Sequence, residues 1–198
     1  MGNLGSVINA LQFLDEEAII ISRPENIADC RALIVPGVGA FGDCAAHLQK
    51  SNFDNQLKEW ISSGKPLMGI CLGLQILFDE SEESPGTKGL GIFSGTVKKF
   101  QLSKQLKVPQ IGWNKLFIKN KSCPMFKNIN DEDYFYLVHS YYVYSDDKAI
   151  IAGETDYGVK YCSCVWKENI FATQFHPEKS QKVGLTMLKN FCDWSNTF

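Results

Sequence analysis

Histidine is scarce in this sequence, which has only three among its 198 residues. Its seven cysteines are odd in number and form no C-x-x-C pair, so a disulfide framework and a zinc site are both disfavoured. The chain also lacks an apolar run of about 18 residues and a signal-peptide pattern. A formal net charge of -2 gives no sign of a nucleic-acid partner. These absences favour a cytoplasmic protein in a reducing compartment, with no metal and no other cofactor.

The length and composition predict one α/β domain over residues 1–198. With 44% hydrophobic residues, a chain of this size can bury one substantial core. Apolar residues at helical spacing predict helices over 6–14, 47–61 and 183–194, and a further helix after residue 71. Short apolar runs predict strands over 18–22, 32–35, 65–70, 95–97, 115–118 and 135–138. This order of elements predicts a mixed, mostly parallel sheet flanked by helices.

The stretch Gly69-Ile70-Cys71-Leu72-Gly73 places a cysteine between two glycines, where a strand-like run turns into a helix-like one. This is the pattern of a nucleophile elbow that carries sulfur in place of oxygen. Glycines let neighbouring backbones approach a strained turn, and a helix N-terminus favours thiolate and offers N–H groups to an oxyanion. For this pentapeptide alone, a buried and unreactive cysteine is the alternative. The choice depends on a base elsewhere in the chain.

His176 is the candidate base. It follows the alternating run 171–175 and precedes Pro177, so it is expected at the end of a strand. Glu178 follows on a rigid turn, where it would hold the imidazole in the tautomer that accepts the thiol proton. A strand-end histidine bonded to the backbone is the alternative for this position taken alone. In combination with Cys71, the pair predicts a Cys-His-Glu triad.

A glycine-rich loop follows the predicted strand that ends at Val35. Gly37 and Gly39 would let backbone N–H groups face an oxyanion at the carboxyl edge of an open α/β sheet, which is where ligands bind. An ordinary strand-to-helix turn is the alternative. The loop is not a phosphate loop, because no G-x-x-x-x-G-K-[ST] pattern follows.

Several motifs occur along nearly the whole chain in an order known from one family. They are Met1-Gly2-Asn3-Leu4, Pro36-Gly37-Val38-Gly39, the elbow at Cys71, Val108-Pro109-Gln110-Ile111-Gly112-Trp113-Asn114, His139-Ser140-Tyr141-Tyr142 and Gln174-Phe175-His176-Pro177-Glu178-Lys179-Ser180. With these motifs the sequence resembles the class I, or triad, glutamine amidotransferases. Within that family it is similar to the glutaminase subunits of imidazole glycerol phosphate synthase. The resemblance implies a flavodoxin-like fold.

The resemblance also implies a role for each matching residue. Cys71 would attack the side-chain amide of glutamine to give a glutamyl thioester and ammonia, with His176 as the base and Glu178 as its partner. His139 would have a structural role. The oxyanion hole would be formed by backbone N–H groups of Leu72 and of the loop at Val38 and Gly39. The residues expected to hold the glutamine substrate are Gly37, Gln75, Ser140 and Tyr141.

A second subunit is implied as well. In the family, a (β/α)8-barrel cyclase forms a heterodimer with the glutaminase and uses its ammonia to make imidazole glycerol phosphate for histidine biosynthesis. Trp113, Asn114 and Lys179 resemble family positions near the surface for that partner, although the bulky Trp113 could equally belong to the core. A paralogue that feeds ammonia to a barrel synthase for bacterial surface sugars stays open. So does a non-catalytic regulatory subunit, although the intact triad argues against it.

The sequence differs from the family pattern at its start. Family members have an apolar strand before the Met-Gly-Asn-Leu motif, and here Met1 is the methionine of that motif. We therefore expect the first strand of the sheet to be missing, which leaves backbone groups unpaired and apolar neighbours uncovered at a cost of several kcal/mol. Either the start has been placed too late, or another segment compensates.

Overall fold

A computed structural model describes residues 4–103 and 105–198, so most of the Met1-Gly2-Asn3-Leu4 motif lies outside the described residues. The helices are α1 (Leu4–Phe13), η1 (Pro24–Asp29), α2 (Phe41–Lys50), α3 (Phe53–Ser62), α4 (Leu72–Gln75), η2 (Pro124–Phe126), η3 (Lys148–Ile150), η4 (Pro177–Lys179) and α5 (Gln181–Ser195), where η marks a 3-10 helix. The strands are β1 (Leu33–Gly37), β2 (Leu67–Cys71), β3 (Phe78–Ser81), β4 (Phe93–Lys99), β5 (Gln110–Lys115), β6 (Phe117–Ile118), β7 (Tyr134–His139), β8 (Tyr141–Ser145), β9 (Ile151–Asp156), β10 (Lys160–Lys167) and β11 (Ile170–Thr173).

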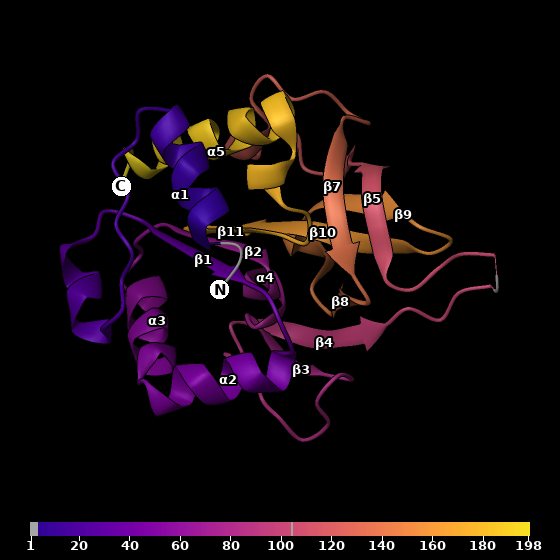
Figure 1. The fold of residues 1–198 in the computed structure, drawn as a ribbon, viewed down its shortest axis with the longest axis horizontal. Helices are drawn as coiled ribbons and strands as arrows, with labels where there is room; N and C mark the ends of the chain where they lie inside the picture. The colour runs from indigo at the N-terminus through magenta and orange to yellow at the C-terminus, as the bar shows by residue number, and fades with distance from the viewer. Residues whose placement is uncertain (1–3, 104) are drawn as a thin grey trace.

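The main sheet is mixed. Its strand order is β1-β2-β11-β10-β8-β4-β3, with β9 beside β10 and β6 beside β9. The pairs β1/β2, β2/β11 and β3/β4 are parallel, whereas β10 is antiparallel to β11, β8 and β9. A separate antiparallel pair, β5/β7, stands on the other side of the molecule from β1 (Figure 1). The prediction of a mixed sheet flanked by helices is confirmed.

Two apolar clusters cover the two faces of the parallel strands. Helices α1 and α5 lie over one face, and α2 and α3 over the other (Figure 1). Residues of β2 alternate between the clusters: Met68 and Ile70 pack under α1 and α5, and Leu67 packs under α2 and α3. Burial on both faces explains why β2 reads as a continuous apolar run, and it places the end of this strand at the centre of the molecule.

Two helix predictions need correction. The helix predicted over 47–61 is two helices, because α2 ends at Lys50 and α3 begins at Phe53 after Asn52, whose φ is +59°. Asparagine tolerates this left-handed conformation, so the chain can turn there while the apolar spacing continues. The helix after residue 71 ends at Gln75, and Phe78 already begins β3.

The strand predicted over 18–22 is wrong. This segment pairs with no strand in the described structure, and Ile19 and Ile20 are 68% and 57% exposed. The residues have the β-branched composition of a strand, but a strand also needs a neighbouring backbone to bond with. The nearest candidate, β1, forms the edge of the sheet and pairs only with β2 among the described residues.

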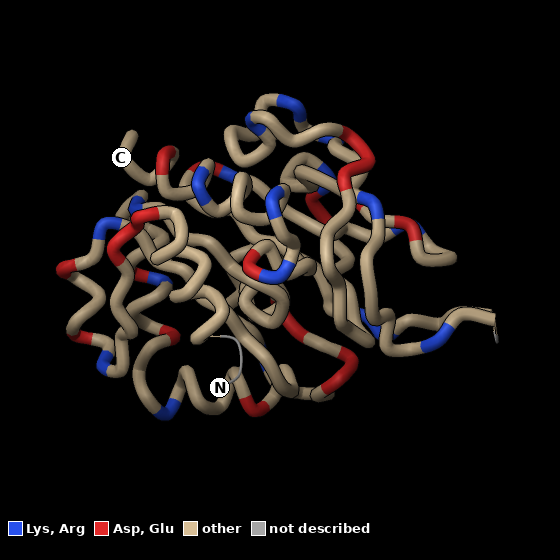
Figure 2. Tube along the Cα trace, turned by 45° about the horizontal axis from the view of Figure 1, so that its top comes forward, with Lys and Arg blue, Asp and Glu red and all other residues tan. Residues whose placement is uncertain are grey.

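Charged residues of both signs are interspersed along the surface of the chain (Figure 2). Within the described residues, no helix combines the length and the apolar character that crossing a membrane requires.

Candidate active site

The chain makes a sharp turn at Cys71, where β2 ends and α4 begins. Cys71 has a φ of +57° and a ψ of -106°, which is strained for a residue with a side chain. A Cβ atom on Gly73 would collide with the backbone oxygen of Val35, and one on Gly69 would lie 2.6 Å from the backbone oxygen of Gly73. The two glycines therefore allow the close backbone approach that was predicted for the elbow.

The three predicted triad residues lie together. His176 follows β11 and precedes η4, and its Nδ1 atom lies 2.9 Å from Oε1 of Glu178. The other side of the ring interacts with the Cys71 side chain. His176 is 1% exposed and Cys71 9% exposed, and the Glu178 side chain is fully buried. The arrangement gives a thiol, an imidazole and a carboxylate in series, shielded from solvent.

The electrostatics of this series favour a charged imidazole. Burial by itself lowers the pKa of His176, but hydrogen bonds and charge interactions with Cys71 and Glu178 outweigh that effect and raise the pKa to about 9. Glu178 accepts from Nδ1, which leaves the opposite nitrogen directed to the sulfur. A protonated His176 ring beside the sulfur can donate a proton to a leaving amine.

A second chain of hydrogen bonds reaches Cys71 through Gln75 and Gln174. The Gln75 side chain, on α4, donates from Nε2 to the backbone oxygen of Tyr141 and to Oε1 of Gln174, at 3.1 Å each. Gln174 in turn donates from Nε2 to Sγ of Cys71 at 3.6 Å. Sequence reasoning gave no role to Gln174, which is fully buried. In the sequence, a polar side chain at position 174 within the mostly apolar run 170–175 is the feature that could have indicated such a role.

The predicted oxyanion loop adjoins the elbow. Gly37, the last residue of β1, is in register with Cys71, and a Cβ atom on Gly37 would lie 2.7 Å from Cβ of Leu72. Val38 is 49% exposed, and Gly39 has a φ of +106°. The structure thus brings Gly37, Val38, Gly39 and Leu72 to the carboxyl ends of β1 and β2, the strand that ends at Cys71.

Ser140 lies between β7 and β8, and Tyr141 is the first residue of β8. His139 donates from Nδ1 to the backbone oxygen of Tyr141 at 2.8 Å, since a carbonyl can only accept, and its Nε2 atom lies 3.2 Å from the Tyr161 hydroxyl. Burial, together with the nearby His176, lowers the pKa of His139 to about 4. His139 is therefore neutral at pH 7 and holds the backbone that also bonds Gln75.

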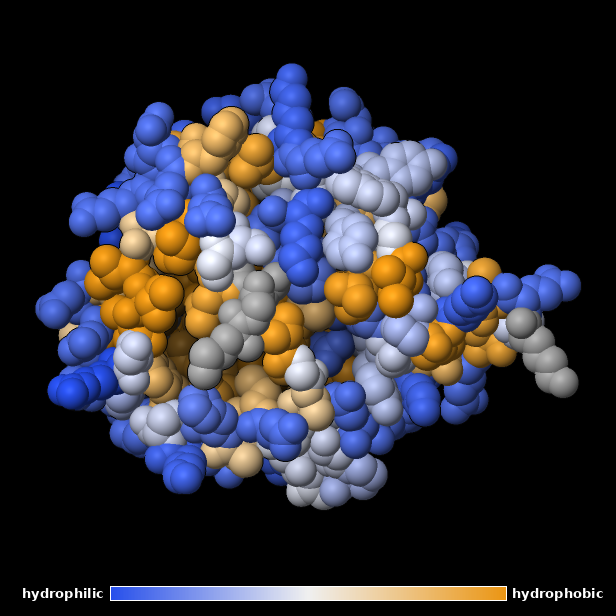
Figure 3. Space-filling model, viewed as in Figure 1, coloured by the Kyte–Doolittle hydropathy of each residue, from blue (hydrophilic) through white to orange (hydrophobic). Residues whose placement is uncertain are grey.

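The three residues predicted near a partner surface are on or beside β5 and η4. Trp113 is 45% exposed, so it is not a core residue, and its ring meets the edge of Tyr136 at a centroid distance of 6.1 Å. The Asn114 amide donates to the backbone oxygen of Asp156, and Lys179 is exposed. Apolar side chains gather over the lower part of β5 and β7 in Figure 3. No group of three His, Cys, Asp or Glu side chains in residues 4–103 and 105–198 is arranged to hold a metal ion.

Comparison with known proteins assigns the family. The model of the family "Glutamine amidotransferase class-I" matches residues 4–194. The chain belongs to the class-I glutamine amidotransferases. A relative from Acinetobacter baylyi, "Imidazole glycerol phosphate synthase subunit HisH", is 42% identical over 195 residues, which cover 98% of this chain and 95% of the relative. A relative of the same name from Dehalococcoides mccartyi is 47% identical over 190 residues, covering 96% of this chain and 91% of the relative.

Solved structures show the same fold at low sequence identity. The "Structure of PurLQS from Thermotoga maritima" is similar to this amidotransferase with a TM-score of 0.76 at 18% identity, over 96% of this chain and 92% of that one. A "Crystal structure of glutamine amidotransferase" has a TM-score of 0.75, also at 18% identity, over 97% and 93% of the two chains. The class-I amidotransferase fold predicted from the motifs is confirmed.

Proposed function

We propose that this chain is the glutaminase subunit of an imidazole glycerol phosphate synthase. It hydrolyses glutamine to glutamate and ammonia through a cysteinyl thioester, and it passes the ammonia to a (β/α)8-barrel cyclase in histidine biosynthesis. The observation that carries the proposal is the buried series Cys71, His176 and Glu178 at a strained elbow, in a chain of the class-I amidotransferase family. The names of the relatives favour the histidine pathway over surface-sugar amidation.

In the proposed first step, His176 takes the proton of the Cys71 thiol and the sulfur attacks the side-chain carbonyl carbon of glutamine. The charge that develops on the carbonyl oxygen is bound by the N–H of Leu72 and by one from the Val38-Gly39 loop. The imidazolium then gives its proton to the departing nitrogen, so the C–N bond breaks and ammonia leaves. Glu178 stabilises the imidazolium throughout, which fits the raised pKa of His176.

Water completes the cycle. His176 removes a proton from a water molecule that attacks the thioester carbonyl, the C–S bond breaks, and glutamate leaves with the sulfur restored. Gln75 and the backbone at Ser140 and Tyr141 hold the substrate. Tyr141 is already fixed in place by His139, which supports a preformed binding site.

The β5/β7 surface is the proposed seat of the barrel partner. Ile111 and Trp113 on β5 are 64% and 45% exposed, and aromatic residues of this kind are enriched where proteins bind one another. The neighbouring strand β7 contacts the triad directly, because the backbone N–H of His176 donates to the backbone oxygen of Tyr136, on β7, at 2.9 Å. A partner seated on Trp113 and Lys179 would therefore press on the segment that carries the base. A cytoplasmic location fits the seven cysteines, all of which are unpaired.

The test uses the chain combined with the cyclase subunit of imidazole glycerol phosphate synthase. Synthesis is measured with glutamine and, separately, with ammonia as the nitrogen donor. We expect Cys71→Ala to abolish synthesis from glutamine and to leave synthesis from ammonia nearly intact, because the elbow acts only before ammonia is formed. Equal loss with both donors would contradict the proposal. Failure of the unmodified chain to support synthesis with this cyclase would point instead to another barrel synthase.

A further inference from the structure

Tyr161, on β10, has a buried hydroxyl next to side chains from two other strands. The hydroxyl oxygen lies 3.2 Å from Nε2 of His139, the last residue of β7, and 2.9 Å from Oε1 of Gln110, the first residue of β5. All three side chains are buried. Gln110 and His139 are opposite each other in the β5/β7 pairing. The hydroxyl of Tyr161 therefore joins β10 to the separate strand pair at one buried point.

Aromatic rings surround the phenol of Tyr161. Its ring centroid lies 5.3 Å from those of Phe100 and His139 and 5.5 Å from that of Tyr142. The Phe100 ring meets it edge to face, at an interplanar angle of 82°. Burial raises the pKa of Tyr161 well above its ordinary value, so the hydroxyl keeps its hydrogen at pH 7. The phenol is thus a donor held in a fixed place.

The tautomer of His139 determines where this hydrogen goes. Nδ1 of His139 carries a hydrogen, because it lies 2.8 Å from the backbone oxygen of Tyr141, which can only accept. The ring is neutral at pH 7, so Nε2 has a free lone pair and accepts. Among the described residues, the Tyr161 hydroxyl is the one hydrogen-bond partner recorded for Nε2. Nε2 therefore receives its hydrogen bond from Tyr161.

Gln110 can adapt to this direction. A hydroxyl has one hydrogen, so Tyr161 cannot donate to Nε2 of His139 and to Oε1 of Gln110 at once. A half-turn of the Gln110 amide places its N–H group against the Tyr161 oxygen. The half-turn breaks no other bond, since the part of the chain that the structure describes offers no recorded partner to Nε2 of Gln110. Gln110 then donates to Tyr161, Tyr161 to His139, and His139 to Tyr141.

This series of hydrogen bonds ends at the substrate site. The Tyr141 oxygen that accepts from His139 also accepts from Nε2 of Gln75, at 3.1 Å. Gln75 and the backbone at Ser140 and Tyr141 are the proposed binding groups for glutamine, so the inference rests on the proposed function. A carbonyl that is held by two donors keeps one position, and displacement of a binding group costs affinity.

We propose that Tyr161 is a positioning residue for glutamine binding: through His139 it fixes the backbone of Tyr141 against Gln75, and Gln110 orients its hydroxyl. Gln174 keeps its own hydrogen bond to the sulfur of Cys71. Tyr161 therefore acts on the affinity for glutamine rather than on the chemical step.

The test replaces Tyr161 by phenylalanine, which keeps the ring and removes only the hydroxyl. Glutamine hydrolysis is measured for the full chain combined with the cyclase subunit. KM for glutamine should rise by about 3- to 10-fold, as expected for one buried hydrogen bond, and kcat should change by less than about twofold. A fall in kcat at unchanged KM, or no change in either, overturns the proposal.

The direction of the hydrogen bonds is tested by 15N NMR of the His139 ring at pH 7. The unmodified chain should carry hydrogen on Nδ1 and none on Nε2. Tyr161→Phe should move the Nε2 resonance toward that of a nitrogen without a hydrogen bond. Hydrogen on Nε2 of the unmodified chain would contradict the proposal. This readout needs no activity: a chain that hydrolysed no glutamine would refute the proposed function, and NMR would still decide whether Tyr161 fixes His139.

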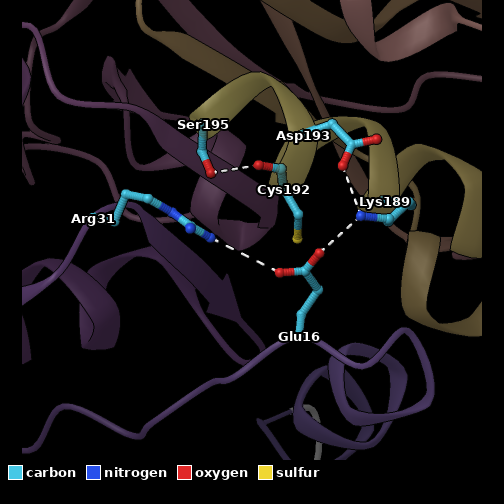
Figure 4. Close-up of polar contacts among 6 residues, drawn as sticks. All are labelled: Glu16, Arg31, Lys189, Cys192, Asp193 and Ser195. Atoms are coloured by element: carbon cyan, nitrogen blue, oxygen red, sulfur yellow. Dashed lines mark hydrogen bonds and ion pairs between the residues drawn. The ribbon is translucent and has the colours of Figure 1, made fainter. Parts of the chain in front are cut away.

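Two controls separate positioning from packing and stability. Tyr142→Phe makes the same change in the same aromatic group, at a hydroxyl with no hydrogen bond recorded in the described structure, and should leave KM unchanged. Figure 4 shows Glu16 between Arg31 and Lys189, at 3.8 and 3.0 Å, and Arg31 precedes β1, whose other end adjoins Cys71. Glu16→Gln should lower Tm by up to a few degrees at unchanged KM. A rise in KM in either control as large as in Tyr161→Phe overturns the proposal.

A double substitution tests whether Tyr161 acts through His139. In His139→Asn the amide nitrogen can still donate to Tyr141, but the side chain is too short to meet Tyr161. Adding Tyr161→Phe to this variant should raise KM by less than about twofold, because the connection is already cut. A further rise as large as in the otherwise unmodified chain would contradict the path through His139.

Discussion

Gln174 donates a hydrogen bond to the sulfur of Cys71, with 3.6 Å between Nε2 and Sγ. The acceptor side of the same amide receives Gln75, so the orientation of Gln174 is fixed and its N–H group stays directed at the sulfur. His176 approaches the sulfur as well. Two donors on one sulfur stabilise a thiolate more than one does, and they restrict where the sulfur can point.

We therefore predict that Gln174→Leu lowers kcat for glutamine hydrolysis by about 10- to 100-fold, the equivalent of one hydrogen bond to a charged group. Gln174→Glu, which keeps the size but places a carboxylate against the sulfur, should lower it further. The rate at which a glutamine-analogue electrophile labels Cys71 checks the cause, because a lost donor leaves the attacking sulfur less well oriented. An unchanged labelling rate in both variants would assign Gln174 a packing role only.

Substitutions of His176 and of Glu178 are predicted to have unequal effects on catalysis. His176→Ala should reduce thioester formation by several orders of magnitude, because the proton acceptor is gone, whereas Glu178→Gln should have a milder effect, since the carboxylate orients and stabilises the ring. The measurement is the rate at which a glutamine-analogue electrophile labels Cys71. Labelling of His176→Ala at the rate of the unmodified chain would remove His176 from the role of base.

The lowered pKa of His139 predicts that the free energy of unfolding falls at acidic pH. Its pKa is about 4 in the folded chain and near 6.5 when unfolded, so between these values the unfolded state binds more protons. Stability from this group is present above pH 6.5 and is lost as the pH falls to 4, by up to about 3 kcal/mol. Urea unfolding at pH 7 and pH 5 measures the change. His139→Gln keeps a donor for Tyr141, and its stability should fall less between the two pH values; an equal fall would implicate other groups.

Two glycines provide a matched pair. Gly73→Ala should destabilise the chain by more than about 3 kcal/mol, because its Cβ would collide with backbone of β1. Gly5→Ala, on α1 with no atom within 4 Å, should be neutral or stabilising by up to about 1 kcal/mol. Urea unfolding of the two variants separates close packing from helix propensity. Similar values for both would contradict the close approach at the elbow.

The proposed partner surface is tested at Trp113. Trp113→Ala should weaken binding of the cyclase by about 10- to 100-fold, as loss of a central aromatic contact does. Phe13→Ala removes an aromatic residue that is 75% exposed on α1, away from β5, and should leave Kd unchanged. Calorimetric titration of both variants gives the comparison. An unchanged Kd for Trp113→Ala would move the partner to another face.

The parts that sequence reasoning predicted are those with a local signature. The elbow at Cys71 was readable because two glycines and a change of periodicity coincide in five residues, and His176 because proline ends its strand. The segment 18–22 has a local signature too, but a strand also needs a neighbouring strand to pair with. The nearest candidate, β1, does not pair with this segment. Gln174 was missed as a contact because an isolated buried amide does not reveal which neighbour it faces.

The positive φ of Cys71 means that this chain is less stable than its fold allows. Glycine takes that conformation without strain. Any other residue at this position, cysteine included, destabilises the folded state by roughly 1–3 kcal/mol relative to glycine. Selection for stability alone would favour glycine at this position. The presence of cysteine marks the elbow as a place where stability was given up, and stabilising substitutions should be sought elsewhere in the molecule.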